Sequence, residues 1–120
     1  MEHEVSAYYD ITHGLGLAII TPRWMEFCLN DKTVSKYVQY GVNVFGIDAA
    51  LPPREIAEKA IQATHDFFAS IGIPMTLREV GIDESRIDEM AHHIAVNEGL
   101  ENAYVPLTEQ DIKEILIASL

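Results

Sequence analysis

Basic residues are scarce in this sequence, and their scarcity argues against several classes of partner. Eight Lys and Arg stand against 19 Asp and Glu, giving a formal net charge of -11. Binding to a phosphate backbone needs clustered Lys and Arg side chains, so nucleic acid is not an expected partner. An anionic membrane surface is disfavoured for the same reason. The acidic excess is largest from Asp66 onward, where 11 acids face three bases, a pattern typical of a solvated helical surface.

Membrane spans, signal peptides and disulfide frameworks also find no support in the sequence. No apolar run reaches the ~18 residues that a membrane span needs. The first residues, Met1–Glu4, are acidic and lack the basic and apolar regions of a signal peptide. Cys28 is the only cysteine, so we expect a small buried apolar side chain there rather than a metal ligand. These features predict a cytoplasmic protein.

Apolar residues recur at helical spacing along most of the chain. Stripes of this kind lie within residues 34–45, 57–71, 87–95 and 112–116. Gly41 lies inside the first stripe and indicates the close approach of another backbone. The pattern predicts an all-α fold, a bundle of about six or seven helices that forms one domain over residues 1–120.

Residues typical of helix ends flank these stripes. Pro53 suits the first turn of a helix and Gly72 its end. Asp83 is expected to be an N-cap and Gly99 the stop of the next helix. Thr108 is expected to cap a last helix after the connection marked by Pro106. Thr76-Leu77-Arg78-Glu79 is typical of a capping box that opens a short helix.

The segment from Leu15 to Leu29 is apolar on nearly all sides. A helix of that kind is usually buried at the centre of a fold. The alternative is a buried strand over residues 17–20 that ends at Pro22. We favour a helix kinked at Pro22, because the segment is long and nothing else in the chain offers strand partners.

Two histidines, His3 and His13, lie ten positions apart. His13 precedes Gly14 at the start of the apolar segment, where an imidazole could reach a cleft while the helix stays buried. Imidazole binds iron, zinc, copper or nickel, but a metal site usually needs three or four protein ligands. By spacing alone, a non-catalytic role is favoured for both histidines. Tyr8 and Tyr9 could line a pocket, although core packing is favoured.

The remaining polar candidates are expected to have local roles. His92 and His93 fall off the apolar stripe of their helix and are expected to face water. His65 borders its stripe and is expected to form a local hydrogen bond rather than bind a metal. Asp10 lies three residues before His13, where it would either accept a hydrogen bond from that imidazole or cap a helix.

The residues around His3 and His13 resemble those of a known family. The matching blocks are HEVSAYYDITHG at residues 3–14 and LAIITPRWM at residues 17–25, followed by GIP at 72–74 and YVPLT at 104–108. They resemble the iron-containing alcohol dehydrogenases, and most closely those of the NADH-dependent butanol dehydrogenase type. The resemblance extends over the whole chain, and its most specific part is the first block.

This resemblance implies the carboxy-terminal helical domain of a two-domain enzyme, with a dehydroquinate synthase-like α-domain fold. The intact enzyme would hold Fe²⁺ or Zn²⁺ through one Asp and three His, and would use NAD(P). Two of the His follow the pattern His-x3-His-x9-His, whose middle His lies beside the nicotinamide. By this match His13 is the final metal ligand, and His3 is a catalytic or cofactor-binding histidine. The other metal ligands would lie upstream of this chain.

The resemblance also implies a reaction, the interconversion of aldehydes and primary alcohols. One imidazole does not hold ferrous iron against water and other ligands, and the chain contains no glycine-rich phosphate-binding loop. We therefore expect the chain alone to bind no metal or NAD(P) stably and to be inactive. Its expected partners are an amino-terminal nucleotide-binding domain and further copies of itself. The alternatives are a stand-alone helical oligomerisation or interaction module, and a small metal-binding protein that shares ligands between two copies.

Overall fold

The computed structural model describes all 120 residues and contains helices but no strand. Its elements are α1 (Glu2–Tyr9), α2 (His13–Cys28), α3 (Val34–Phe45), α4 (Pro53–Ser70), α5 (Ile87–Asn97) and α6 (Glu109–Ala118), with the short 3₁₀ turns η1 (Arg78–Val80), η2 (Glu84–Arg86) and η3 (Leu100–Asn102). The prediction of an all-α fold is confirmed. None of the helices has the length and apolar character needed to cross a membrane.

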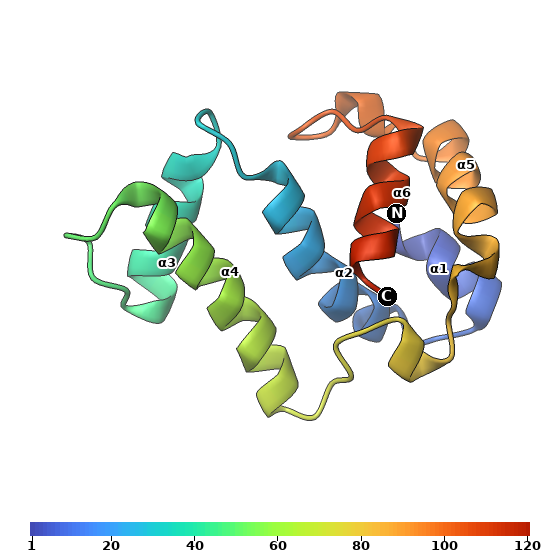
Figure 1. The fold of residues 1–120 in the computed structure, drawn as a ribbon, viewed down its shortest axis with the longest axis horizontal. Helices are drawn as coiled ribbons and strands as arrows, with labels where there is room; N and C mark the ends of the chain where they lie inside the picture. The colour runs from blue at the N-terminus through green and yellow to red at the C-terminus, as the bar shows by residue number, and fades with distance from the viewer.

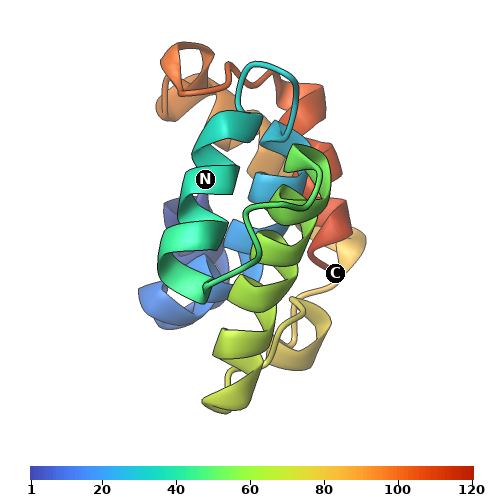
Figure 2. The ribbon, with the colours of Figure 1, turned by 90° about the vertical axis from the view of Figure 1, so that its left-hand side faces the viewer.

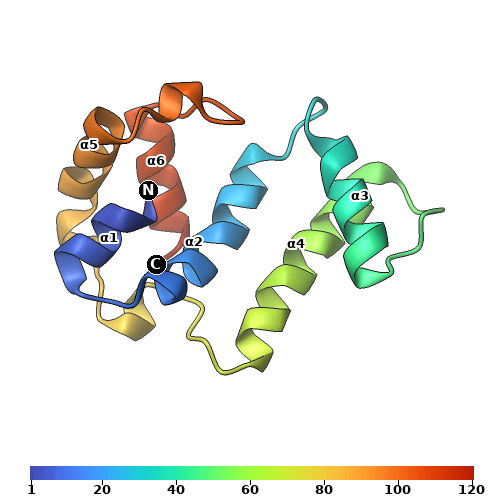
Figure 3. The ribbon, with the colours of Figure 1, turned by 180° about the vertical axis from the view of Figure 1, so that it is seen from behind.

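The central element of the molecule is α2. On one side it packs against α4, which pairs with α3, and on the other side it packs against α1 and α6 (Figure 1). Figure 2 shows α3 and α4 side by side at one end of the molecule. Seen from behind, α1, α5 and α6 form the opposite group, and both chain termini lie on that side (Figure 3).

Two apolar clusters hold these groups to α2. The larger one lies among α1, α2, α5 and α6 and includes Val5, Ile19, Met90, Ile112 and Leu116, each at most 1% exposed. The smaller one lies among α2, α3 and α4 and consists of Leu29, Tyr37, Ala57 and Ile61. Ile19 and Ile20 of α2 belong to the larger cluster, and Met25 of α2 packs against the smaller one, so α2 lies between the two groups of helices.

The segment that begins at Leu15 is helical and continues through Pro22, so the helix was correctly favoured over the strand. The prediction that it is buried on every side needs correction. Leu17 is 43% exposed, and Trp24 is only partly buried. Both side chains line a cavity, which explains why the apolar pattern of the sequence extends beyond the face that is packed in the core.

Most of the predicted helix ends are confirmed. Pro53 opens α4, and Thr108 forms a capping box with Asp111 at the start of α6. The Thr76–Glu79 hydrogen bonds also form, around the short turn η1. Asp83 differs from the prediction, since its side chain accepts a hydrogen bond from the Ser85 amide and opens η2 rather than α5. The 3₁₀ turn runs directly into α5, whose own N-cap residue, Arg86, makes no side-chain capping bond.

Candidate functional site

The turn between α1 and α2 determines where the two amino-terminal histidines lie. Asp10 ends α1 in the left-handed conformation, with φ 51° and ψ 39°, and its amide donates a 2.8 Å hydrogen bond to the Ser6 carbonyl. Thr12 is extended, and α2 begins at His13. This short turn brings the first residue of α2, His13, against the first turn of α1, where His3 lies. The rings of His3 and His13 therefore stack, with centroids 4.8 Å apart and planes 10° from parallel.

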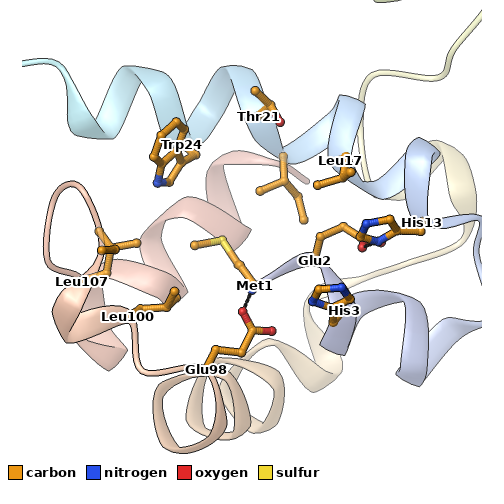
Figure 4. A pocket seen from close by; sticks show the side chains of 12 residues that line it. Met1, Glu2, His3, His13, Leu17, Thr21, Trp24, Glu98, Leu100 and Leu107 are labelled. Atoms are coloured by element: carbon orange, nitrogen blue, oxygen red, sulfur yellow. Dashed lines mark ion pairs between the residues drawn. The ribbon is translucent and has the colours of Figure 1, made fainter.

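A cavity of about 420 Å³ opens beside this histidine pair. Figure 4 shows the side chains that line it, which come from Met1, α1, α2 and the segment after α5. They are Met1, Glu2, His3, His13, Leu17, Ile20, Thr21, Trp24, Glu98, Leu100, Ala103 and Leu107. Both imidazoles thus border a largely apolar space. Its size lies within the range of small-molecule pockets, roughly 300–1,000 Å³.

Glu2 is a member of this site that the sequence reasoning missed. Its side chain is buried, only 5% exposed. It accepts a hydrogen bond from the Ser6 hydroxyl and forms an ion pair with Nδ1 of His13. The available signal was the four-residue spacing of Glu2 and Ser6 within one turn of α1.

Of the two alternatives for Asp10, the acceptor role is wrong, because the ion-pair partner of His13 is Glu2. The role of Asp10 is the capping one, as the C-cap residue of α1. Tyr8 and Tyr9 do not line the cavity and pack against the larger apolar cluster, as favoured from the sequence. The Tyr8 hydroxyl lies 3.0 Å from Nδ1 of His93.

The other histidines lie away from the cavity. His92 and His93 are exposed, as predicted, and His92 lies 3.1 Å from a carboxylate oxygen of Glu109. His65 forms the expected local contact, with its Nδ1 3.2 Å from Asp66. Cys28 is fully buried, and this burial raises the pKa of its thiol to about 11, which confirms its predicted apolar role.

No group of three or more His, Cys, Asp or Glu side chains in the chain is arranged to hold a metal ion. The histidine pair offers a different arrangement. The imidazole of His13 is 52% exposed, and its Nδ1 faces Glu2. Its Nε2 is therefore the nitrogen left to bind a ligand. An imidazole nitrogen is a donor that suits iron or zinc, so His13 offers one ligand of a suitable type, whereas a metal site needs three or four.

The fold and site define a class of protein, an all-helical domain that presents a histidine pair beside an apolar cavity. The chain belongs to the Fe-containing alcohol dehydrogenase family, whose C-terminal domain profile matches residues 1–120. It is 52% identical over 116 residues to NADH-dependent butanol dehydrogenase A of Clostridium acetobutylicum, covering 96% of this chain and 30% of the relative. The chain thus spans about a third or less of the length of the curated relatives that it matches.

Solved structures agree with this assignment. NADH-dependent butanol dehydrogenase A from Thermotoga maritima superposes with a TM-score of 0.84 at 30% identity, covering 98% of this chain and 31% of that one. The substrate- and cofactor-free aldehyde reductase YqhD from E. coli superposes with a TM-score of 0.87 at 27% identity, covering 99% and 31%. Both matches show that the fold is that of the helical domain of this family.

Proposed function

We propose that this chain is the metal-site domain of an NAD(P)H-dependent, iron-type alcohol dehydrogenase that interconverts aldehydes and primary alcohols. We also propose that the chain alone does not catalyse this reaction. The observation that carries the proposal is the stacked pair of His3 and His13 at the edge of an apolar cavity. The names of the relatives, which include butanol dehydrogenases and an aldehyde reductase, support the substrate class.

In this proposal Nε2 of His13 would be the atom that binds the metal. A bound metal would supply Lewis-acid polarisation of the substrate carbonyl, and bound NAD(P)H would supply the hydride. His3 lies against the face of His13 and lines the same cavity, so it is placed to orient the cofactor or to move a proton at the substrate oxygen. The apolar walls formed by Leu17, Trp24 and Leu100 would exclude water from the reacting groups.

The proposed inactivity of the chain alone follows from what the reaction requires. Hydride transfer needs a bound nicotinamide, and no glycine-rich phosphate-binding loop is present in the sequence. The metal needs further ligands, and no cluster in the chain supplies them. The proposed partners are therefore a nucleotide-binding domain that contributes those ligands and, in the assembled enzyme, further copies of the same subunit.

A chimera tests the proposal. The amino-terminal part of the Clostridium acetobutylicum relative would be fused ahead of Glu2, so that residues 2–120 complete the enzyme. The fusion should reduce butyraldehyde with NADH and retain about one metal ion per chain, whereas the 120-residue chain should do neither. Activity of the isolated chain would contradict the proposed inactivity.

His13→Ala in the same chimera tests the metal role. Loss of one of four ligands should lower both metal content and activity at least tenfold, because the remaining three leave the site open to exchange. His65→Ala is the matched control, since that imidazole lies away from the cavity and contacts Asp66. If the His13→Ala chimera kept its full metal content, the assignment of His13 would be wrong.

A further inference from the structure

The side chain of Glu2 is buried, and the cost of removing its carboxylate from water must be offset by polar partners. Isolated charges are rarely buried, because desolvation costs several kcal/mol unless partners replace the lost water. One oxygen of Glu2 accepts the hydroxyl hydrogen of Ser6, one turn further along α1. The other, Oε2, is buried and accepts no hydrogen bond from another group, and its partner is Nδ1 of His13, with which it forms an ion pair. The imidazole is thus the partner that Glu2 requires.

Gly16 provides the space for this carboxylate. A Cβ built on Gly16 would lie 2.9 Å from Cγ of Glu2 and closer still to its Oε1. Real Cβ atoms do not approach other atoms so closely, so any side chain here would displace the glutamate. Gly14, two residues earlier on α2, has nothing within 4 Å of the corresponding position. Glycine at position 16 therefore leaves the room that the Glu2 side chain occupies.

The ring of His13 is restrained from two directions. Glu2 meets its edge at Nδ1, and His3 covers its face at a centroid distance of 4.8 Å. Stacking restrains the plane of the ring, but it does not decide which of the two ring nitrogens carries the proton. The carboxylate is the group that distinguishes the two nitrogens, because an ionised carboxylate only accepts hydrogen bonds.

We infer that Glu2, seated on Gly16 and held by Ser6, is the positioning residue that keeps the imidazole proton of His13 on Nδ1 and so leaves Nε2 free for a metal. The part concerning the metal rests on the proposed function, and the part concerning the proton does not. Carboxylate partners of this kind orient metal-binding histidines in other proteins and make the ligand nitrogen more basic.

The first test measures the proton directly. In the ¹⁵N-labelled 120-residue chain at about pH 8, where imidazole is ordinarily neutral, the ring nitrogen shifts of His13 report the tautomer. The native chain should show the proton on Nδ1. Glu2→Ala should shift the population towards the Nε2–H form, and Glu2→Gln should restore part of the Nδ1–H form through its amide oxygen. A native chain with the proton on Nε2 would overturn the inference.

Two variants separate positioning from a merely structural role. Glu4→Ala removes a carboxylate from the same helix without touching His13 and should leave the tautomer unchanged. Gly16→Ala keeps Glu2 but displaces it, so this variant should reproduce the tautomer shift of Glu2→Ala. Since Glu2→Ala and Gly16→Ala disturb the site by different means, a shift in both identifies the contact between Glu2 and His13 as the cause. A folded Gly16→Ala chain with the native tautomer would contradict the proposed seat.

The second test uses the chimera with the relative's amino-terminal part and follows metal loss to a chelator. Glu2→Ala should accelerate the loss or weaken the affinity roughly 10- to 100-fold, as for other histidine-orienting residues, while Glu4→Ala should not. If His13→Ala has no effect on metal retention, the proposed function fails. If His13→Ala weakens retention and Glu2→Ala does not, only the role of Glu2 in metal binding fails.

Discussion

Two buried side chains, Cys28 and Tyr37, hold their protons more tightly than usual. Burial raises the pKa of the Cys28 thiol from 9.0 to about 11. Burial also raises the pKa of the Tyr37 phenol from 10.0 to about 12, with a smaller contribution from the nearby Cys28. The Tyr37 hydroxyl donates a 2.8 Å hydrogen bond to the Met25 carbonyl. Both groups lie where α2 meets α3, so their ionisation is coupled to the integrity of that contact.

These raised pKa values predict a loss of stability at alkaline pH. Between the unfolded and folded pKa values the unfolded chain binds fewer protons, so the free energy of unfolding falls as pH rises. The Cys28 contribution is fully present below pH 9.0 and is lost by about 11, and that of Tyr37 is lost between 10.0 and about 12. A shift of this size corresponds to roughly 2–3 kcal/mol per group.

Urea unfolding at a series of pH values measures this loss. Cys28→Ala should remove the fall that begins near pH 9.0, and Tyr37→Phe should remove the part above 10.0. Tyr37→Phe should also cost about 1 kcal/mol at neutral pH, because the Met25 carbonyl loses its donor. A native chain whose stability is constant up to pH 11 would contradict the assignment to these groups.

At the same scale, the sequence identified His3 and His13 but missed Glu2. The histidines were found through a resemblance, since their spacing alone favoured no function. Glu2 was not found because its contact with His13 depends on the left-handed conformation of Asp10, which reverses the chain after α1. Aspartate adopts that conformation less readily than glycine, so the sequence contains no strong signal for the turn. Asp10, which is nearer to His13 in the sequence, was considered in its place.

At the scale of the helix, periodicity and capping residues predicted most of the fold. The stripe around Gly41 and the capping residues at Pro53 and Thr108 are seen where they were expected. The short turn η2 was not anticipated, because an Asp cap opens a 3₁₀ turn as readily as an α-helix. Which helices pack against each other could not be predicted either, since periodicity identifies the buried face of a helix but not the helix that covers it.

The capping box of α6 gives a prediction for helix stability. The Thr108 side chain accepts a hydrogen bond from the Asp111 amide, and the Asp111 carboxylate accepts from the Thr108 amide. Thr108→Ala should therefore lower the free energy of unfolding by about 1 kcal/mol. Thr12 is a matched control, because it is the N-cap residue of α2 but makes no side-chain capping bond. In urea unfolding, Thr12→Ala should change stability by much less, and equal losses would refute the argument.

The close contact between α3 and α4 gives a second prediction. A Cβ on Gly41 would lie 3.1 Å from Cβ of Ala60 and 3.1 Å from Cγ2 of Ile56. Alanine gains about 1 kcal/mol of helix propensity over glycine, but overpacking costs about 1–3 kcal/mol. Ala60 is attached rigidly to its helix and cannot move aside, so we expect the steric cost to be larger.

Gly41→Ala should therefore lower the thermal unfolding midpoint, while Gly14→Ala should leave it unchanged or raise it slightly. The control is matched because Gly14 is also helical and has nothing within 4 Å of the added Cβ. Calorimetry of both variants measures the difference. If both substitutions raised the midpoint, the two helices would have room to separate without cost.

At the scale of the whole molecule, the excess of acidic side chains acts on every helix. Only six of the 19 carboxylates pair with a Lys or Arg side chain, and those pairs are largely exposed. Exposed ion pairs contribute about 0–1 kcal/mol each. Repulsion within a net charge of -11 opposes the compact state and is relieved when the chain unfolds. Screening by salt therefore weakens a few small attractions and a larger repulsion.

We expect the thermal midpoint to rise by roughly 4 °C, or about 1 kcal/mol, between about 0.02 M and 0.5 M NaCl. A double variant, Asp31→Asn with Glu101→Gln, tests the cause, because neither carboxylate forms an ion pair. It removes two negative charges, so its midpoint at low salt should be higher and its rise with salt smaller. If the double variant kept the full salt dependence, the rise would reflect general salt effects on apolar burial rather than charge repulsion. A midpoint that falls with salt would mean that the six ion pairs outweigh the net charge.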